Sequence, residues 1–422
     1  MPNKVNVILN FSKTSRTAFN VLVGALETYV QEPELSIRAA RNTKVLADIL
    51  EQDDGTTQTV VLWSFFSLGF NDARRELGHL KRHIDKPNII HFAGGVHATA
   101  EPLQTLQAGF DFVAVGEGEQ IIVDFVRCLL NGDNLATTQG IAWHEGEILH
   151  RNGRGELIDL NNYPPFAAKN KLFGAIEITR GCIYACKFCQ TPYVSKARFR
   201  HRSIENIAQH ARVMRSHGFK DYRFISPTSL SYGSDNHEVN LDAVEGLLAA
   251  MREAVGPEAR IFFGTFPSET RPEHITREAL RVLKKYVHND NLIIGGQSGS
   301  QAMLDSSKRG HSVEAIVEAV RLCIDEGFSP NVDFLFGLPG ESTEDVQQTL
   351  GLAKTLTDLG AKIHNHTFMP LPGTPFKSSD AGNVDNATQK VIQRLELDGK
   401  AYGRWKQQIK KAKELVRIRD EK

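Results

Sequence analysis

Apolar runs alternate with amphipathic stretches along the first 132 residues. The segments between the runs repeat their apolar positions at helical spacing, as in "TAFNVLVGALETYV". Strands alternating with helices predict a parallel, doubly wound sheet of the flavodoxin-like or Rossmann-like kind. Nearly continuous apolar character within each run is typical of a sheet covered on both faces. The predicted strands are 4–11, 35–40, 59–66, 88–95 and 110–119.

A second alternation begins near residue 171. Six units are fewer than the eight of a closed TIM barrel, so the pattern favours a partial (β/α)6 barrel. Its predicted strands are 174–179, 221–226, 260–265, 291–296, 331–337 and 362–370. The charged tail predicts one or two helices, whose lysines form either a solvated face or an RNA contact.

Residues 140–166 separate the two alternations. They predict a small hairpin and then a linker, because "HEGE" suits a turn and "NNYPPF" carries prolines that stop regular structure. We therefore expect four parts: an α/β domain at 1–135, a hairpin and linker at 136–169, the partial barrel at 170–376 and a helical extension at 377–422.

The composition narrows the class of protein. Fifty Lys and Arg balance fifty Asp and Glu, so the charge indicates neither a nucleic-acid nor a membrane partner. The chain shows no signal-peptide pattern and no apolar run of about 18 residues. Its five cysteines are not a secreted disulfide framework. We expect no membrane insertion and a cytoplasmic location.

Three of the five cysteines stand together in "ITRGCIYACKFCQ", as Cys182, Cys186 and Cys189. They follow the first predicted barrel strand, at the end of the barrel where active sites occur. Cysteine thiolates are the usual ligands of iron–sulfur clusters, and three of them would leave one iron open. Two alternatives are a Cys3His zinc site that includes His201 and three buried thiols without a metal.

The C-x3-C-x-aromatic-C spacing of this loop resembles the motif of the radical S-adenosylmethionine (SAM) superfamily. The resemblance covers about residues 170–375. It implies that the three cysteines hold a [4Fe–4S] cluster whose open iron chelates the amino and carboxylate groups of SAM. It further implies reductive cleavage of SAM to a 5′-deoxyadenosyl radical, with Phe188 near the adenine.

Four later segments resemble other parts of the same family, in the same order. In 224–233, which would bind the SAM amino group, the common Gly-Gly-Glu form is missing. Within 295–312, the resemblance makes Gln297, Ser298 and Arg309 candidates to contact the SAM ribose and carboxylate. In 334–346, Glu341 has the pattern of an acid at a helix start. The segment 368–376 would line the adenine.

Residues 92–119 are similar to the last two βα units of the cobalamin-binding domains that precede some radical SAM barrels. The resemblance implies a corrinoid at the carboxyl edge of the first sheet, with Gly94, Gly95, Gly116 and Gly118 leaving room for it. Ordinary tight turns are the alternative explanation of these glycines. The D-x-H-x-x-G motif of many cobalamin proteins is missing after the first strand, where the chain reads "NFSKTSRTAFNV".

The resemblance therefore implies a cobalamin-dependent radical SAM enzyme that methylates an unreactive carbon of a small-molecule or natural-product substrate. It also implies an external reductant such as flavodoxin or ferredoxin. Alternatives are a methylthiotransferase-like modifier, a radical cyclase or rearrangement enzyme, and a non-catalytic corrinoid- or SAM-binding sensor. The sequence identifies no catalytic side chain, although Tyr193, Tyr232 and His364 fall on the cavity side of the predicted barrel.

Overall fold

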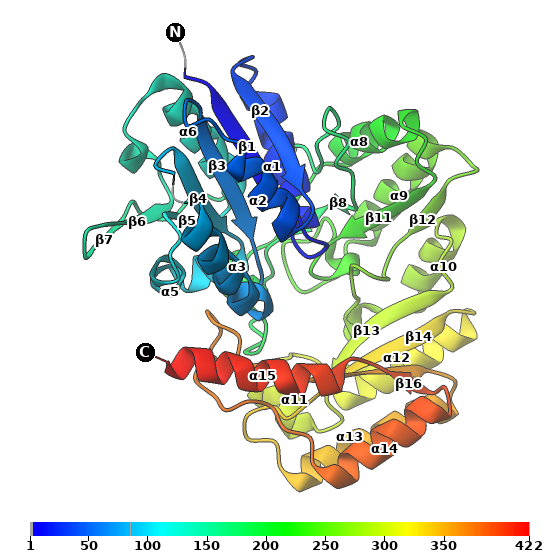
Figure 1. The fold of residues 1–422 in the computed structure, drawn as a ribbon. Helices are drawn as coiled ribbons and strands as arrows, with labels where there is room; N and C mark the ends of the chain where they lie inside the picture. The colour runs from blue at the N-terminus through cyan, green and yellow to red at the C-terminus, as the bar shows by residue number, and fades with distance from the viewer. Residues whose placement is uncertain (1–2, 85, 422) are drawn as a thin grey trace. The chain divides into compact units, whose positions relative to one another are not determined.

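The computed structural model describes residues 3–84 and 86–421, and the chain divides into two compact units between Gly174 and Ala175. The first unit is a single sheet with the strand order β2-β1-β3-β4-β5-β6-β7 (Figure 1). Its first five strands are parallel and have the 2-1-3-4-5 order of flavodoxin-like folds, so the predicted doubly wound domain is confirmed. These strands are β1 (Val5–Asn10), β2 (Leu35–Ala40), β3 (Gln58–Ser64), β4 (Ile89–Gly94) and β5 (Phe112–Ala114).

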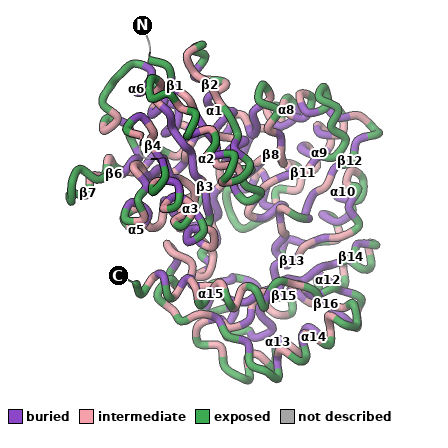
Figure 2. The backbone as a smooth tube through the Cα atoms, viewed as in Figure 1, coloured by how far each residue is buried: buried purple, intermediate pink, exposed green. Residues whose placement is uncertain are grey.

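A helix follows each of the five parallel strands, and the apolar faces of these helices build the core. Phe19 and Leu26 of one helix and Phe125 of another are fully buried in a cluster with Val7 and Val60 of the strands. Figure 2 shows the central strands β1 and β3 as mostly buried, whereas β2 at the edge of the sheet is partly exposed. The helices are α1 (Arg16–Tyr29), α2 (Thr43–Glu51), α3 (Phe70–His83), α4 (Val96–Ala100), α5 (Pro102–Gln107) and α6 (Gly118–Asn131).

The predicted hairpin is the antiparallel edge of the same sheet. Strand β6 (Ile141–Glu145) pairs with β5, and β7 (Ile148–Arg151) pairs with β6. The hairpin is thus held by backbone hydrogen bonds to the first unit, which extends to Gly174.

The second unit contains the six predicted barrel strands, all parallel to their neighbours. They form two sheets, β12-β11-β8 and β13-β14-β15, and the second sheet is extended by a short further strand, β16 (Ala401–Tyr402). A bridge between Thr270 and Ile294 connects the two sheets. The strands are β8 (Ile176–Glu177), β11 (Asp221–Ile225), β12 (Arg260–Phe262), β13 (Asn291–Gln297), β14 (Ser329–Phe336) and β15 (Lys362–Thr367). The partial barrel is therefore confirmed.

Side-chain caps explain where the barrel helices begin. Ser203, Asn240, Thr276, Ser312 and Ser342 each accept a hydrogen bond from a backbone N–H of the following turn. The helices that they start are α8 (Ile204–Ser216), α9 (Leu241–Val255), α10 (Arg277–Tyr286), α12 (Val313–Asp325) and α13 (Thr343–Asp358).

The tail, predicted to form one or two helices, contains α14 (Asn386–Leu397) and α15 (Trp405–Asp420). Between them, β16 (Ala401–Tyr402) adds a short parallel strand beside β15, which the sequence analysis missed. Two residues in a charged tail offer no apolar run, so only their pairing reveals the strand. Within the described ranges, every helix is too short or too polar to cross a membrane.

Candidate active site at the cysteine loop

The cysteine loop leaves the barrel after β8 and is closed at its base by a small antiparallel pair. Strand β9 (Thr179–Arg180) pairs there with β10 (Arg200–His201). Between them, Gly181 has φ +80°, and a Cβ at this position would fall on the carbonyl oxygen of Arg198. Only glycine fits this turn, which directs the chain into Cys182.

The three cysteines of this loop belong to one cluster of packed side chains. Cys182 and Cys186 are 8% and 4% exposed, and Cys189 is partly buried against Phe188. None forms a disulfide. Burial raises the pKa of Cys182 to about 12 and also raises the pKa of Cys189. Buried thiols of this kind become thiolates when a metal centre supplies the compensating charge, which fits an iron–sulfur cluster.

A zinc site with His201 does not fit this loop. Its Nδ1 lies 2.9 Å from the Thr179 hydroxyl and its Nε2 lies 2.7 Å from the Ser234 carbonyl oxygen, so both ring nitrogens are engaged. Zn–S bonds of about 2.3 Å would hold thiolates roughly 4 Å apart. Among the described residues, the one group of three metal-ligating side chains with ligand atoms within 4.8 Å of one another lies elsewhere, on β14 and β15.

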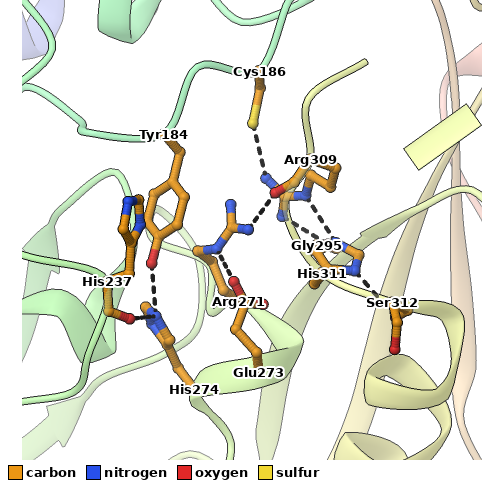
Figure 3. A network of polar contacts seen from close by, with 10 residues as sticks. All are labelled: Tyr184, Cys186, His237, Arg271, Glu273, His274, Gly295, Arg309, His311 and Ser312. Atoms are coloured by element: carbon orange, nitrogen blue, oxygen red, sulfur yellow. Dashed lines mark hydrogen bonds and ion pairs between the residues drawn. The ribbon is translucent and has the colours of Figure 1, made fainter. Parts of the chain in front are cut away.

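Arg309 places a buried positive charge against the cysteine loop (Figure 3). The residue is 5% exposed, and its Nη1 donates to the Cys186 sulfur at 3.6 Å. Its Nη2 donates to the Gly295 carbonyl oxygen at 2.7 Å, and its Nε donates to His311 Nε2 at 3.1 Å. Burial lowers the pKa of His311 to about 4, so this ring is a neutral acceptor. The guanidinium is therefore oriented toward a sulfur that a cluster would make anionic.

Arg271 forms a second cation beneath the loop. It is 2% exposed, its guanidinium carbon lies 3.5 Å from the centre of the Tyr184 ring, and it pairs with Glu273. It also donates to the backbone carbonyl of Arg309. The Tyr184 hydroxyl lies 2.8 Å from Nε2 of His274, so the tyrosine contacts both this histidine and Arg271 (Figure 3). The sequence analysis missed this layer, although "SETRPEH" placed several polar residues directly after a barrel strand.

Glu269 is a partly exposed acid beside this layer. Burial raises its pKa, and the nearby charges of Arg309 and Arg271 oppose that rise. A Cβ on Gly295 would lie 3.0 Å from the Gln297 amide nitrogen and 3.2 Å from a Glu269 carboxylate oxygen. The acid, the amide and the Arg309 guanidinium thus meet around one glycine at the end of β13.

The predicted SAM contacts lie in the same region with different local roles. Gln297 ends β13 with a left-handed φ of +73°. Ser298 is fully buried, and its hydroxyl lies 3.2 Å from the Thr349 hydroxyl and accepts from the Ser300 N–H at 3.1 Å. The Ser298 hydroxyl therefore stabilises the loop that follows β13. Phe188 packs against a cluster of buried side chains that includes Phe368, the first residue of the segment predicted to line the adenine. The SAM contacts of these residues stay predictions.

Glu341 is not the acid of its helix start. Its carboxylate accepts from the Gly337 N–H at 2.6 Å, and burial raises its pKa to about 7. Asp345 instead forms the capping box with Ser342 at the start of α13.

Two of the three cavity-side candidates have internal partners. The Tyr232 hydroxyl donates to the Arg202 carbonyl oxygen at 2.7 Å, and the Tyr193 hydroxyl donates to that of Ala185 at 3.0 Å. Both bonds hold local backbone.

The glycine-rich edge of the first unit is closely packed by its own chain. A Cβ on Gly95 would lie 2.8 Å from the Phe65 carbonyl oxygen, one on Gly116 3.1 Å from the Gly155 nitrogen, and one on Gly118 2.8 Å from a Leu22 methyl. On Gly94 it would meet nothing nearer than 3.7 Å. Packing therefore accounts for three of the glycines, and their role toward a corrinoid stays a prediction.

The loop after β1 closes on itself. The Ser15 hydroxyl accepts from the Ser12 N–H at 2.8 Å, and the Ser12 hydroxyl accepts from the Ser15 N–H at 3.1 Å. Residues 11–15 offer no histidine to a cobalt ion. His97, near the same edge, is 1% exposed and stacks on Phe70 with ring centres 4.2 Å apart, so it is a packing residue.

Comparisons with known proteins agree with this geometry. Residues 176–353 match the family model of the radical SAM superfamily. The tRNA-2-methylthio-N(6)-dimethylallyladenosine synthase of Desulforamulus reducens is 30% identical over 235 residues, which are 55% of this chain and 50% of that protein. The chain spans between 39% and 62% of the length of the first curated relatives that it matches.

Two solved structures share the fold over most of the chain. The radical SAM methyltransferase TsrM from Kitasatospora setae, with cobalamin and a [4Fe-4S] cluster bound, aligns with a TM-score of 0.70 and 15% identity. This alignment covers 89% of this chain and 74% of that chain. The cobalamin-dependent radical enzyme OxsB with aqua-cobalamin bound aligns with a TM-score of 0.65 and 16% identity, over 97% of this chain and 56% of that chain.

Proposed function

Because this chain contains a radical SAM domain and shares the two-part fold of TsrM and OxsB, we propose that it is a cobalamin-dependent radical SAM enzyme. The proposed reaction is reductive cleavage of SAM, used for C-methylation of an unreactive carbon in a small-molecule substrate. The observation that carries the proposal is a loop of three unpaired cysteines with a buried arginine 3.6 Å from one sulfur. That loop lies at the carboxyl end of a barrel strand.

The residues present fit these cofactors to different degrees. When bound, a [4Fe–4S] cluster supplies the electron for SAM cleavage and cobalamin supplies a methyl carrier. Cys182, Cys186 and Cys189 would hold the cluster, and Arg309 would balance part of its negative charge. Buried side chains around the loop keep water from the sulfurs. For cobalamin, the fit rests on the fold of the first unit, in which residues 11–15 after β1 contain no histidine that could be a cobalt ligand.

A methylthiotransferase-like activity is the second candidate, because curated relatives carry that name. The resemblance to that family would require three more cysteines in the N-terminal domain, to hold a second cluster. Residues 1–170 of this chain contain Cys128 alone, a partly exposed residue on α6 that lies 3.8 Å from the Thr137 hydroxyl. Because the cysteine ligands for a second cluster are missing from residues 1–170, we favour methyl transfer over methylthio transfer.

The test begins with anaerobic reconstitution of the full chain with iron, sulfide and hydroxocobalamin. Ala at Cys182, Cys186 or Cys189 should remove the absorbance band at about 400 nm that thiolate-ligated iron gives. Ala at Cys128 or Cys323 should retain it. If a variant lacking all three loop cysteines kept a full iron content, the proposal would be contradicted. If equilibrium dialysis showed no cobalamin bound to the wild-type chain, the proposed dependence on cobalamin would be wrong.

Activity is then measured with SAM under dithionite. We expect methionine and 5′-deoxyadenosine, formed slowly without substrate. With the true substrate, formation of S-adenosylhomocysteine as well would support methylation, because a second SAM must replace the transferred methyl group. Deoxyadenosine alone would favour a cyclisation or rearrangement, and neither product from a protein with a full cluster would favour a sensor.

A further inference from the structure

Strands β14 and β15 bring three metal-ligating side chains together in a group that the cysteine site does not use. Val332 and Phe334 are fully buried on the side of the sheet that α12 covers. Because side chains alternate along a strand, Asp333 lies on the opposite face, inside the partial barrel. His364, which the sequence placed on the cavity side, and His366 meet Asp333 there.

The donor atoms of this group converge. His364 Nδ1 lies 2.9 Å from Asp333 Oδ1 and 3.1 Å from His366 Nε2. The third side of the triangle, from His366 Nε2 to Asp333 Oδ1, measures 3.8 Å. Three atoms with these separations all lie about 2.1 Å from one common point, which is the length of Zn–N and Zn–O bonds. They therefore have the spacing of three ligands of a single metal ion.

Protons alone do not satisfy these contacts. The Gln408 amide oxygen accepts from the Thr367 N–H at 2.8 Å, and its nitrogen donates to His366 Nδ1 at 3.1 Å. His366 Nε2 then carries the ring proton and donates to His364 Nδ1. The lone pair of His364 Nδ1 is thereby left against the Asp333 carboxylate. A proton on His364 Nδ1 would satisfy the carboxylate but would set two N–H groups against each other.

A metal ion removes this conflict, because each of the three atoms then directs a lone pair at the ion. Ligation through Nε2 moves the His366 proton to Nδ1, so the Gln408 amide must turn its oxygen toward the ring to accept it. The turn costs the hydrogen bond to the Thr367 N–H, about 1–3 kcal/mol. Structural zinc sites gain about 10–16 kcal/mol on binding, and a fraction of that exceeds the cost of the turn.

We propose that Asp333, His364 and His366 bind a divalent transition-metal ion. Two imidazoles and one carboxylate suit Zn²⁺ or Fe²⁺, whereas Mg²⁺ and Ca²⁺ prefer oxygen ligands. Both histidine side chains are 27% exposed and that of Asp333 is 13% exposed, so further coordination positions are open to a small molecule. Three protein ligands with open positions are typical of a catalytic rather than a structural metal site.

The surroundings hold these ligands inside the barrel. Tyr402 stacks on the His364 ring with centres 4.4 Å apart and an interplanar angle of 9°, which fixes the plane of this ligand. Leu335, the register partner of His366, packs against the same apolar cluster as Phe188 of the cysteine loop. The ion would therefore bind on the interior side that the cysteine loop also faces, with ligands separate from the three cysteines.

Zinc titration of the full chain tests the site. The three loop cysteines are first replaced by alanine, since their thiols would also bind zinc. Isothermal titration should show one Zn²⁺ bound per chain, and an excess of Mg²⁺ should not displace it. Co²⁺ bound in its place should give the weak visible bands of nitrogen and oxygen ligation, without thiolate charge-transfer bands.

Variants of the ligands locate the bound ion. Asp333→Asn, which keeps the side-chain shape, and His364→Ala should each weaken zinc binding at least about 100-fold, more than the loss of a supporting residue costs. Gln408→Glu should strengthen it about tenfold, because a carboxylate accepts from the Thr367 N–H and from His366 Nδ1–H without turning. Circular dichroism checks that each variant is folded.

The matched control is His83→Ala. His79 and His83 are exposed on α3 with ring centres 4.6 Å apart, so they are the pair best placed to bind zinc adventitiously. Their loss should leave the titration unchanged. Three results would overturn the proposal: no zinc bound by the cysteine-free chain, binding that survives Asp333→Asn, or binding that His83→Ala abolishes. The titration uses no SAM, cluster, cobalamin or reductant, so it stands or fails independently of the proposed function.

Discussion

Arg309→Met is the most informative single perturbation of the site. Methionine keeps much of the side-chain volume but removes the donors to the Cys186 sulfur, the Gly295 carbonyl oxygen and His311. The Gly295 carbonyl oxygen and His311 Nε2 would then be buried without this donor, which costs about 1–3 kcal/mol of stability for each. Glu269 would also lose its strongest opposing charge. We expect the free energy of unfolding of the second unit to fall by about 3–5 kcal/mol.

The assay is urea unfolding of the full apoprotein. In a background with Trp63→Phe and Trp143→Phe, fluorescence comes from Trp405, which is 1% exposed in the second unit and therefore reports on that unit. Adding Glu269→Gln to Arg309→Met should restore about 1–2 kcal/mol, because the unpaired acid is then gone.

The control is Arg281→Met, whose side chain is 61% exposed and pairs with Glu326 at 3.3 Å. It should cost less than about 0.5 kcal/mol. The reasoning is refuted if Arg309→Met costs less than about 1 kcal/mol, or if the double variant is no more stable than the single one.

Two further predictions concern the loops around the site. Gly181→Ala should lower the iron content after reconstitution and cost several kcal/mol, since its methyl group would fall on the Arg198 carbonyl; Gly218→Ala has a similar φ of +82° but open space, and should cost only about 1 kcal/mol. Equal losses in the two variants would show that close packing at Gly181 is unimportant. Glu341, whose pKa is raised to about 7, stabilises the fold fully below pH 4.5 and loses that contribution as the pH rises to 7. Glu341→Gln should therefore increase the free energy of unfolding at pH 8 by up to about 3 kcal/mol relative to wild type, and so raise Tm at that pH. At pH 4.5 the substitution should have little effect. An equal rise in Tm at both pH values would contradict the raised pKa.

The sequence by itself identified the doubly wound sheet of the first unit, the partial barrel of the second unit and the cysteine loop. Long apolar runs at regular spacing predict parallel strands because burial on both faces requires apolar side chains at every position. Three cysteines within eight residues are a local pattern, so their shared role needed no knowledge of the rest of the chain. The two-residue strand β16 escaped detection because its pairing with β15 is a long-range contact.

Only the tertiary structure decided what surrounds the cysteines. Arg271 follows β12, Arg309 follows β13 and Tyr184 lies on the cysteine loop, yet the three side chains are in one buried layer. Likewise, Asp333 and His364 are 31 positions apart and meet because β14 and β15 align them in register. Charged side chains in a sequence are exposed by default, and nothing local distinguishes the few that a fold buries together. Their burial, and with it the chemistry of the site, depends on how the barrel strands are aligned.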